Sequence, residues 1–131
     1  MSASTSDDLG KLVLRFSVGG IVLLHGIAKL RHGIDAIAGM VAGIGLPAGF
    51  AYAVYLGEVL GPLLLIIGFY ARIGAVLIVA NMIVAIALVH RHEILLLGDQ
   101  GGWAIELQAL MLLGAVASAL LGPGRWALNQ R

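Results

Sequence analysis

The chain contains no cysteine among its 131 residues. This absence excludes disulfides, thiolate metal ligands and thiol redox chemistry carried by the chain itself. Charged residues are also scarce, at 11% of the chain against about 25% in a typical soluble domain. The net charge of +1 leaves no basic stripe for a nucleic-acid partner. The sequence shows no metal-ligand set and no nucleotide-binding fingerprint either.

Hydrophobic residues, in contrast, make up 60% of the chain. A protein this small cannot bury so much apolar surface in water, so lipid must cover it. A bilayer core of about 30 Å needs roughly 20 helical residues per crossing. Four stretches meet this length, namely residues 12–31, 48–69, 72–91 and 103–121. We therefore predict an all-α integral membrane protein, a four-transmembrane-helix bundle that forms a single domain over residues 1–131.

The segment between the first two spans, Gly33 to Leu46, is too short to cross a bilayer. Its apolar residues recur at helical spacing, and Asp35 at its start suits the positive end of a helix dipole. We predict a short interfacial helix that ends at Gly45-Leu46-Pro47. An irregular loop is the alternative.

Basic residues are distributed unequally between the two ends of the predicted bundle. An even number of spans places both termini on one side, where five basic residues lie against three on the other. This bias predicts that both termini are cytoplasmic, with Arg15, Arg72 and Arg125 anchoring the membrane rim. The acidic leader, with Asp7 and Asp8, disfavours a cleaved signal peptide.

Polar residues inside the spans need an explanation, because an ionisable side chain at membrane depth costs roughly 2.5 kcal/mol or more. At a rise of about 1.5 Å per residue, five of them fall in the outer half of the bundle. This candidate ligand-binding cluster consists of His25, Lys29, Glu58, Glu106 and Gln108. Asn81 marks the centre of the third span.

Pro62 should disturb the second span next to Glu58. Proline has no N–H to donate to the carbonyl four residues back, which belongs to Glu58. The resulting kink would make room for a polar ligand or water. Two interpretations stay open: a ligand-binding site, or a structural network in which Glu58 pairs with His25 or Lys29. A bis-histidine haem is disfavoured, because His25 and His90 differ by about 8 Å in depth.

Several short motifs follow one another along most of the chain. They are Arg15 with Gly19, His25-Gly26-xx-Lys29-Leu30, Gly45-Leu46-Pro47, Gly57-Glu58-xx-Gly61, Leu65-xx-Gly68 before Arg72, Gly101-Gly102 before Glu106, and Gly122-Pro123-Gly124. In order and spacing the chain resembles the DoxX family of small four-helix bacterial membrane proteins, over about residues 11–128.

The resemblance implies a location in the bacterial inner membrane and a functional cluster at Lys29, Glu58 and Glu106. The family includes relatives of the membrane subunit of a thiosulfate:quinone oxidoreductase, and other members are linked to redox-stress complexes. Our leading hypothesis is a quinone-associated membrane subunit of an oxidoreductase that relies on a soluble or membrane redox partner. The alternatives are a non-catalytic scaffold or assembly factor, and a small-solute or proton carrier acting as a homo-oligomer.

Overall fold

The structure of the protein, a computed structural model, describes residues 2–131. The longest element is α1 (Ala3–His32), whose 30 residues span about 45 Å. The Ser2 side chain caps its start by accepting a hydrogen bond from the Thr5 N–H. Gly33, with φ +83°, ends it. Leu97 and Trp103 form an isolated bridge, and the described residues contain no named strand.

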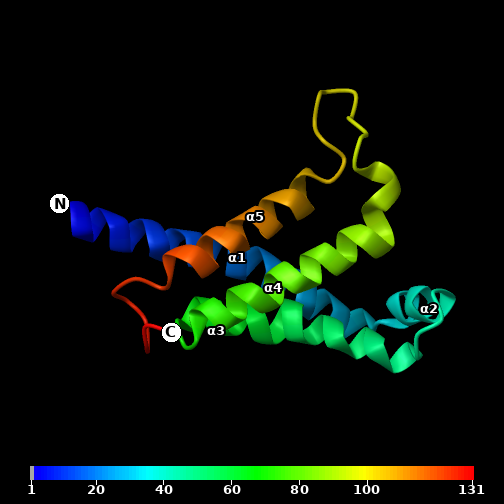
Figure 1. Cartoon of the computed structure of the whole chain (residues 1–131), viewed down its shortest axis with the longest axis horizontal. Coiled ribbons are helices and arrows are strands. Elements are labelled where there is room, and N and C mark those ends of the chain that lie inside the picture. The colour runs from blue at the N-terminus through cyan, green and yellow to red at the C-terminus, as the bar shows by residue number, and fades with distance from the viewer. Residues whose placement is uncertain (1) are drawn as a thin grey trace.

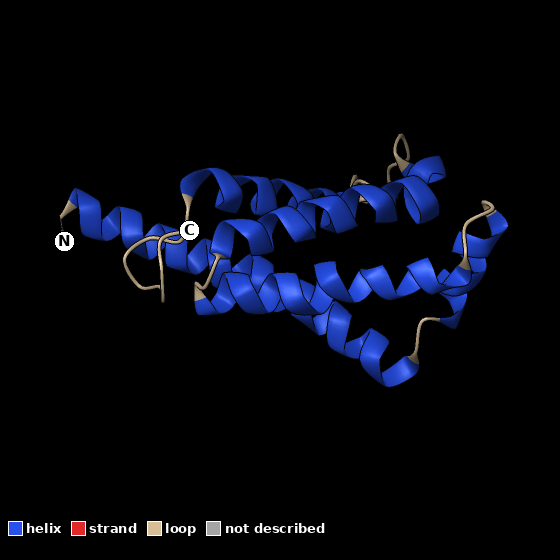
Figure 2. Cartoon of the chain, turned by 60° about the horizontal axis from the view of Figure 1, so that its bottom comes forward, coloured by secondary structure: helices blue, strands red, loops and turns tan. Residues whose placement is uncertain are grey.

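The other named elements are helices or helical turns (Figures 1 and 2). In chain order they are α2 (Asp35–Gly43), the 3-10 helix η1 (Ala48–Ala53), the π-helical turn η2 (Leu56–Leu60), α3 (Gly61–Ile67), α4 (Ala71–Ala85), the π-helical turn η3 (Ile86–His90), the 3-10 turn η4 (Arg91–Glu93) and α5 (Glu106–Leu121). The predicted short helix between the first two spans is confirmed as α2.

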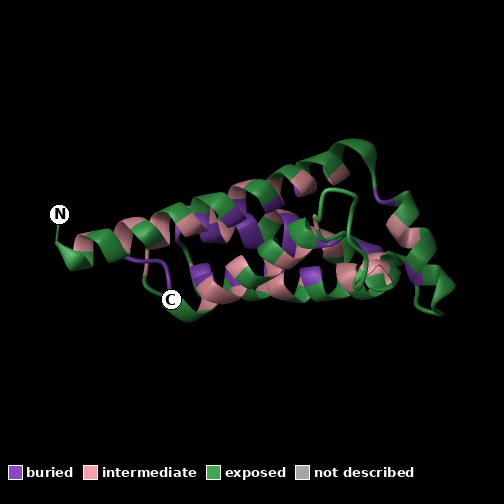
Figure 3. Cartoon of the chain, turned by 90° about the horizontal axis from the view of Figure 1, so that it is seen from above, coloured by how far each residue is buried: buried purple, intermediate pink, exposed green. Residues whose placement is uncertain are grey.

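The helices form a ring in which α1 packs against α3 and α5, and α4 also packs against α3 and α5. The described N- and C-terminal ends lie at one end of the bundle and α2 at the other (Figure 1). Val22, Leu65, Ile78 and Ala115 bring all four helices into one buried core. The helices expose much of their outward surface (Figure 3), and many of the exposed residues are large and apolar, as lipid contact requires.

Three helical segments are long and apolar enough to cross a membrane: Ala3–His32, Ala48–Ile67 and Ala71–Glu93. The predicted fourth span is shorter than expected, because α5 has 16 residues, or about 24 Å. It begins at Glu106, whereas the prediction began at Trp103. The Trp103 indole instead donates to the Ile94 carbonyl over 2.5 Å, in a loop that folds back on itself. Three spans are supported by length, and the fourth is not confirmed.

Close helix packing depends on glycines in the second and third spans. Gly61 of α3 and Gly74 of α4 face each other, so a Cβ on Gly74 would lie 2.5 Å from the Gly61 carbonyl oxygen. On the other side of the bundle, a Cβ on Gly114 would lie 2.6 Å from the Val18 side chain. These contacts let the helix backbones approach closely, as small residues do in membrane bundles.

Arg15 departs from the prediction of a rim anchor, because the structure buries it to 1% exposure. Its guanidinium donates four hydrogen bonds of 2.7–3.0 Å to backbone carbonyls, those of Leu65, Ile66, Pro123 and Trp126. Arg15 thus joins α1 to the end of α3 and to the C-terminal segment. The physical reason is that helix C-termini leave carbonyls without partners, and a planar guanidinium can satisfy several at once.

Candidate functional site

The site begins where α1 crosses η2, at the end of the bundle away from the termini. Gly26 of α1 lies directly against the Glu58 carbonyl, so that any Cβ at position 26 would collide with it. This close approach places the next helical turn of α1, with Lys29, beside the Glu58 side chain. The Tyr55 hydroxyl donates to the Lys29 carbonyl over 3.2 Å and ties the end of α1 to the same segment.

Lys29 and Glu58 form a direct ion pair, in which the ammonium donates to one carboxylate oxygen, Oε2. Glu58 is 2% exposed, whereas the Lys29 side chain is 30% exposed. The predicted pairing of Glu58 with a cation of the first span is therefore present, and the partner is Lys29. A carboxylate this buried needs such a partner to stay charged.

The predicted disturbance at Pro62 takes the form of the π-helical turn η2. The Gly61 N–H donates to the Leu56 carbonyl, five residues back, one residue before the proline that has no N–H. A π-bulge re-aims side chains within a helix and is frequent at functional sites. Here it contains Glu58 itself, and the Glu58 carbonyl faces Gly26 of the neighbouring helix.

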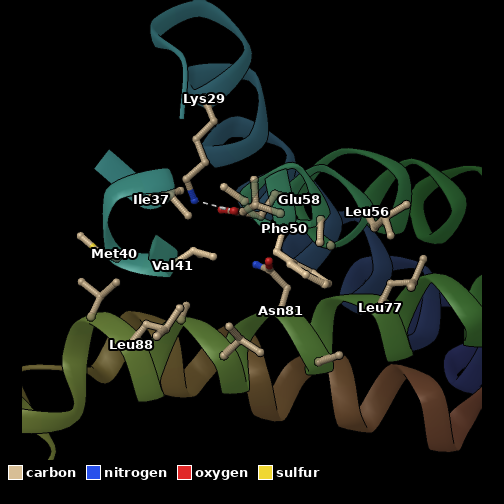
Figure 4. Close-up of a pocket in the computed structure, with 18 residues that line it drawn as sticks. Lys29, Ile37, Met40, Val41, Phe50, Leu56, Glu58, Leu77, Asn81 and Leu88 are labelled. Carbon is tan, nitrogen blue, oxygen red and sulfur yellow. Dashed lines mark hydrogen bonds and ion pairs between the residues drawn. The ribbon is translucent and has the colours of Figure 1, made fainter. Parts of the chain in front are cut away.

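A cavity of about 290 Å³ opens beside the ion pair (Figure 4). Its walls come from α1, α2, η1, η2, α4 and η3, so both π-helical turns border it. Three of its lining residues are polar: Lys29, Glu58 and Asn81. The rest of the lining is apolar and includes Ile37, Met40, Val41, Phe50, Leu77 and Leu88.

Asn81 reaches this cavity from α4, on the wall across from the ion pair (Figure 4). A Cβ on Gly57 would collide with the Asn81 side chain, so the glycine makes room for it against η2. The sequence identified Asn81 as central in its span but did not group it with the cluster. The sequence feature that could have assigned Asn81 to the site is its position, because it is an amide in the middle of an otherwise apolar helix.

The other three residues of the predicted cluster lie outside this cavity. The His25 ring is directed at its own helix, where Nδ1 lies 2.9 Å from the Ile21 carbonyl oxygen. Glu106 is exposed in the first turn of α5 and lies close to Gly102 of the preceding loop. Gln108 is half-buried on α5. The structure thus brings together Lys29 and Glu58 and adds Asn81.

This arrangement combines two kinds of recognition. Beyond the N–H that Glu58 accepts, Lys29 keeps two N–H donors, Glu58 supplies a carboxylate that accepts, and the amide supplies both a donor and an acceptor. The apolar walls favour a hydrophobic ligand. The adjoining cavity is the observation on which a binding site, rather than a purely structural pair, can be proposed.

Comparison with known proteins agrees with this fold. The DoxX family pattern matches residues 10–91, which is more than half of the chain. The protein named "Uncharacterized membrane protein Rv3486", from Mycobacterium tuberculosis, is 31% identical over 129 residues, covering 92% of this chain and 79% of the relative. "Putative oxidoreductase CatD" from Bacillus subtilis is 32% identical over 124 residues, covering 95% of this chain and 87% of the relative. No solved structure matches. The chain therefore belongs to the DoxX family of membrane proteins.

Proposed function

We propose that this protein is a quinone-binding membrane subunit of a redox system. The observation that supports the proposal is the cavity, with apolar walls and three polar residues, Lys29, Glu58 and Asn81. A quinone has a polar head that needs hydrogen-bonding partners and an apolar tail that needs a hydrophobic channel. The name of the Bacillus subtilis relative, which describes an oxidoreductase, points in the same direction.

The dimensions of the cavity suit a quinone head. Ligand pockets commonly measure about 300–1,000 Å³, and this one, at about 290 Å³, lies just below that range. It is large enough for the ring and the first part of a tail, and the remaining tail would lie along the apolar outer surface of the helices. Lipid covers that surface, so a membrane-soluble ligand needs no aqueous route to the site.

The ion pair suits the chemistry of a quinone head as well as its shape. Reduction of a quinone consumes protons together with electrons, and its oxidation releases them. Lys29 can donate a hydrogen bond to a quinone oxygen, and the Glu58 carboxylate can accept one from a quinol hydroxyl, so the pair can bind the head in both oxidation states. The chain has no cysteine with which to carry electrons, so an electron-transferring partner would supply them.

The decisive experiment measures quinone bound to the purified protein. Wild type in mild detergent should contain co-purified quinone, and adding a short-tailed benzoquinone should raise its melting temperature. Glu58→Gln keeps the volume but removes the negative charge and with it the ion pair to Lys29, so it should lose both effects. Glu106→Gln is the matched control, because this exposed carboxylate lies outside the cavity.

A wild-type protein that contains no quinone and gains no stability from saturating quinone would exclude the proposal. The Lys29–Glu58 pair would then be structural, as in a scaffold or assembly factor. Loss of quinone from Glu106→Gln as well as Glu58→Gln would instead extend the site toward α5.

The location that goes with this function is the bacterial inner membrane with both termini in the cytoplasm. Reporter fusions test this orientation. A fusion after Arg131 should report the cytoplasm, and one inserted in the loop at residues 97–101 should report the opposite side. A periplasmic signal from the C-terminal fusion would reverse the orientation.

A further inference from the structure

The side-chain amide of Asn81 is a polar group without a hydrogen-bond partner in the described part of the protein. Its side chain makes no hydrogen bond to any of the residues that the structure describes. It lies half-buried on α4 among apolar neighbours such as Leu77, Ala80 and Val84. The lack of a partner within the described residues leaves the donor and the acceptor of this amide free to bind a ligand in the cavity.

The position of this amide is set by the backbone of the opposite wall. A Cβ at Gly57 would overlap the Asn81 Cβ and come within 3.0 Å of its amide oxygen, so the side chain lies directly against η2. Gly57 immediately precedes Glu58 in that turn. The amide and the ion pair therefore line one cavity from different elements, the amide from α4 and the pair from α1 and η2 (Figure 4).

We propose that Asn81 is a specificity-determining residue, and that the site selects a ring with two oxygen functions over a ring with one. This inference rests on the proposed quinone site and names its ligand class as 1,4-quinones and 1,4-quinols. One oxygen would meet the Lys29–Glu58 pair and the other the Asn81 amide. The amide can donate to a quinone carbonyl or accept from a quinol hydroxyl, so it serves both oxidation states.

A ring with a single oxygen would leave one of these polar groups without a partner. A site built to hydrogen-bond a hydroxyl discriminates against an analogue that lacks it, because its own buried polar groups are then left unpaired. One lost hydrogen bond corresponds to about a five- to tenfold loss of affinity.

The test compares decyl-1,4-hydroquinone with 3-decylphenol, which has the same tail and one hydroxyl fewer. Wild type in detergent, under reducing conditions, should bind the hydroquinone about five- to tenfold more tightly. Asn81→Leu, which keeps the branched shape and removes the amide, should bind both compounds with equal affinity. Without ligand, this variant should melt at the same or a higher temperature than wild type, because it removes an unpaired amide.

Ser118→Ala is the matched control. The Ser118 hydroxyl also has no hydrogen-bond partner among the described residues, but it is fully buried on α5 and lies outside the cavity. Its removal should leave the preference for the hydroquinone unchanged.

Two results would overturn the assignment of Asn81 in different ways. If wild type binds the hydroquinone but Asn81→Leu keeps the full preference over the phenol, the quinone site stands and Asn81 has no role in selection. If Asn81→Leu lowers the melting temperature and keeps the preference, the amide is structural. Failure of wild type to bind either compound would instead remove the proposed function itself.

Discussion

Arg15 and Glu58 are both almost completely buried, at 1% and 2% exposure, yet their surroundings differ in kind. Arg15, near the termini, donates four hydrogen bonds to backbone carbonyls and does not line the cavity beside the ion pair. Glu58, toward the other end, has one charged partner and adjoins open space. Burial of a charge therefore does not by itself mark a functional site. The informative feature is a polar group whose hydrogen-bonding capacity the protein leaves partly free.

The largest effect is expected from Arg15→Met. Four carbonyls would lose a charged donor, and each such hydrogen bond contributes about 1.5–3 kcal/mol, so the loss of stability should reach at least about 3 kcal/mol. Quinone bound per folded protein should stay unchanged, because Arg15 lies outside the cavity. Thermal unfolding in detergent measures the first quantity and quinone extraction the second.

Lys11→Met is the control for Arg15, one helical turn earlier on the same helix. Its ion pair with Asp7, at 2.7 Å, is a surface i,i+4 pair, which contributes at most about 1 kcal/mol. An Arg15→Met protein as stable as Lys11→Met would contradict a structural role for the buried guanidinium.

The Lys29–Glu58 ion pair should make the stability effects of substituting its two members non-additive. Lys29→Met leaves a buried carboxylate unpaired and should cost about 3 kcal/mol, somewhat less where water in the cavity hydrates it. Adding Glu58→Gln should recover part of this loss, with a coupling of about 0.5–3 kcal/mol in the double-mutant cycle. Additive effects would mean that the two side chains do not interact in the folded protein.

The positions of the helices along the chain could be predicted from the sequence better than the directions of their side chains. Apolar length located three of the four predicted spans, and helical spacing located α2. The cost of a buried carboxylate predicted a cation partner for Glu58, which is Lys29. Depth along a span follows from residue counting, so these predictions needed no knowledge of the neighbours.

Residue counting does not predict the direction in which a side chain points, and it does not predict contacts with distant backbone groups. His25 shares a helical face with Lys29, yet its ring is directed at a carbonyl of its own helix. The acceptors of Arg15 lie 50 to 111 residues away and are carbonyls, which every residue has, so no sequence pattern singles them out. Trp103 counts as apolar in a span, but the hydrogen bond of its indole to Ile94 belongs to a loop.

A smaller effect is expected from Gly26→Ala, which tests the helix crossing that positions Lys29. The new Cβ would collide with the Glu58 carbonyl and force the two backbones apart, at a typical cost of about 1–3 kcal/mol. Because the shift separates Lys29 from Glu58, bound quinone should fall as well.

Gly20→Ala provides the control on the same helix, since a Cβ at Gly20 meets no atom within 4 Å. It should leave both stability and bound quinone close to wild type. If Gly26→Ala behaved in the same way, the close approach of α1 and η2 would not be needed to form the site.

The smallest effect is expected from Arg125→Gln. This substitution compares an exposed arginine with the buried Arg15 at the same end of the bundle. Arg125 is the same residue type as Arg15 and binds Asp8 of α1 through its side chain at 3.1 Å and its backbone N–H at 3.0 Å. Its side chain is 53% exposed, however, so solvent and salt screen the pair. We expect a loss below about 1 kcal/mol that shrinks further at high ionic strength. Melting curves at low and high salt, run beside Arg15→Met, measure the difference. Equal losses for the two arginines would show that burial and carbonyl contacts do not distinguish them.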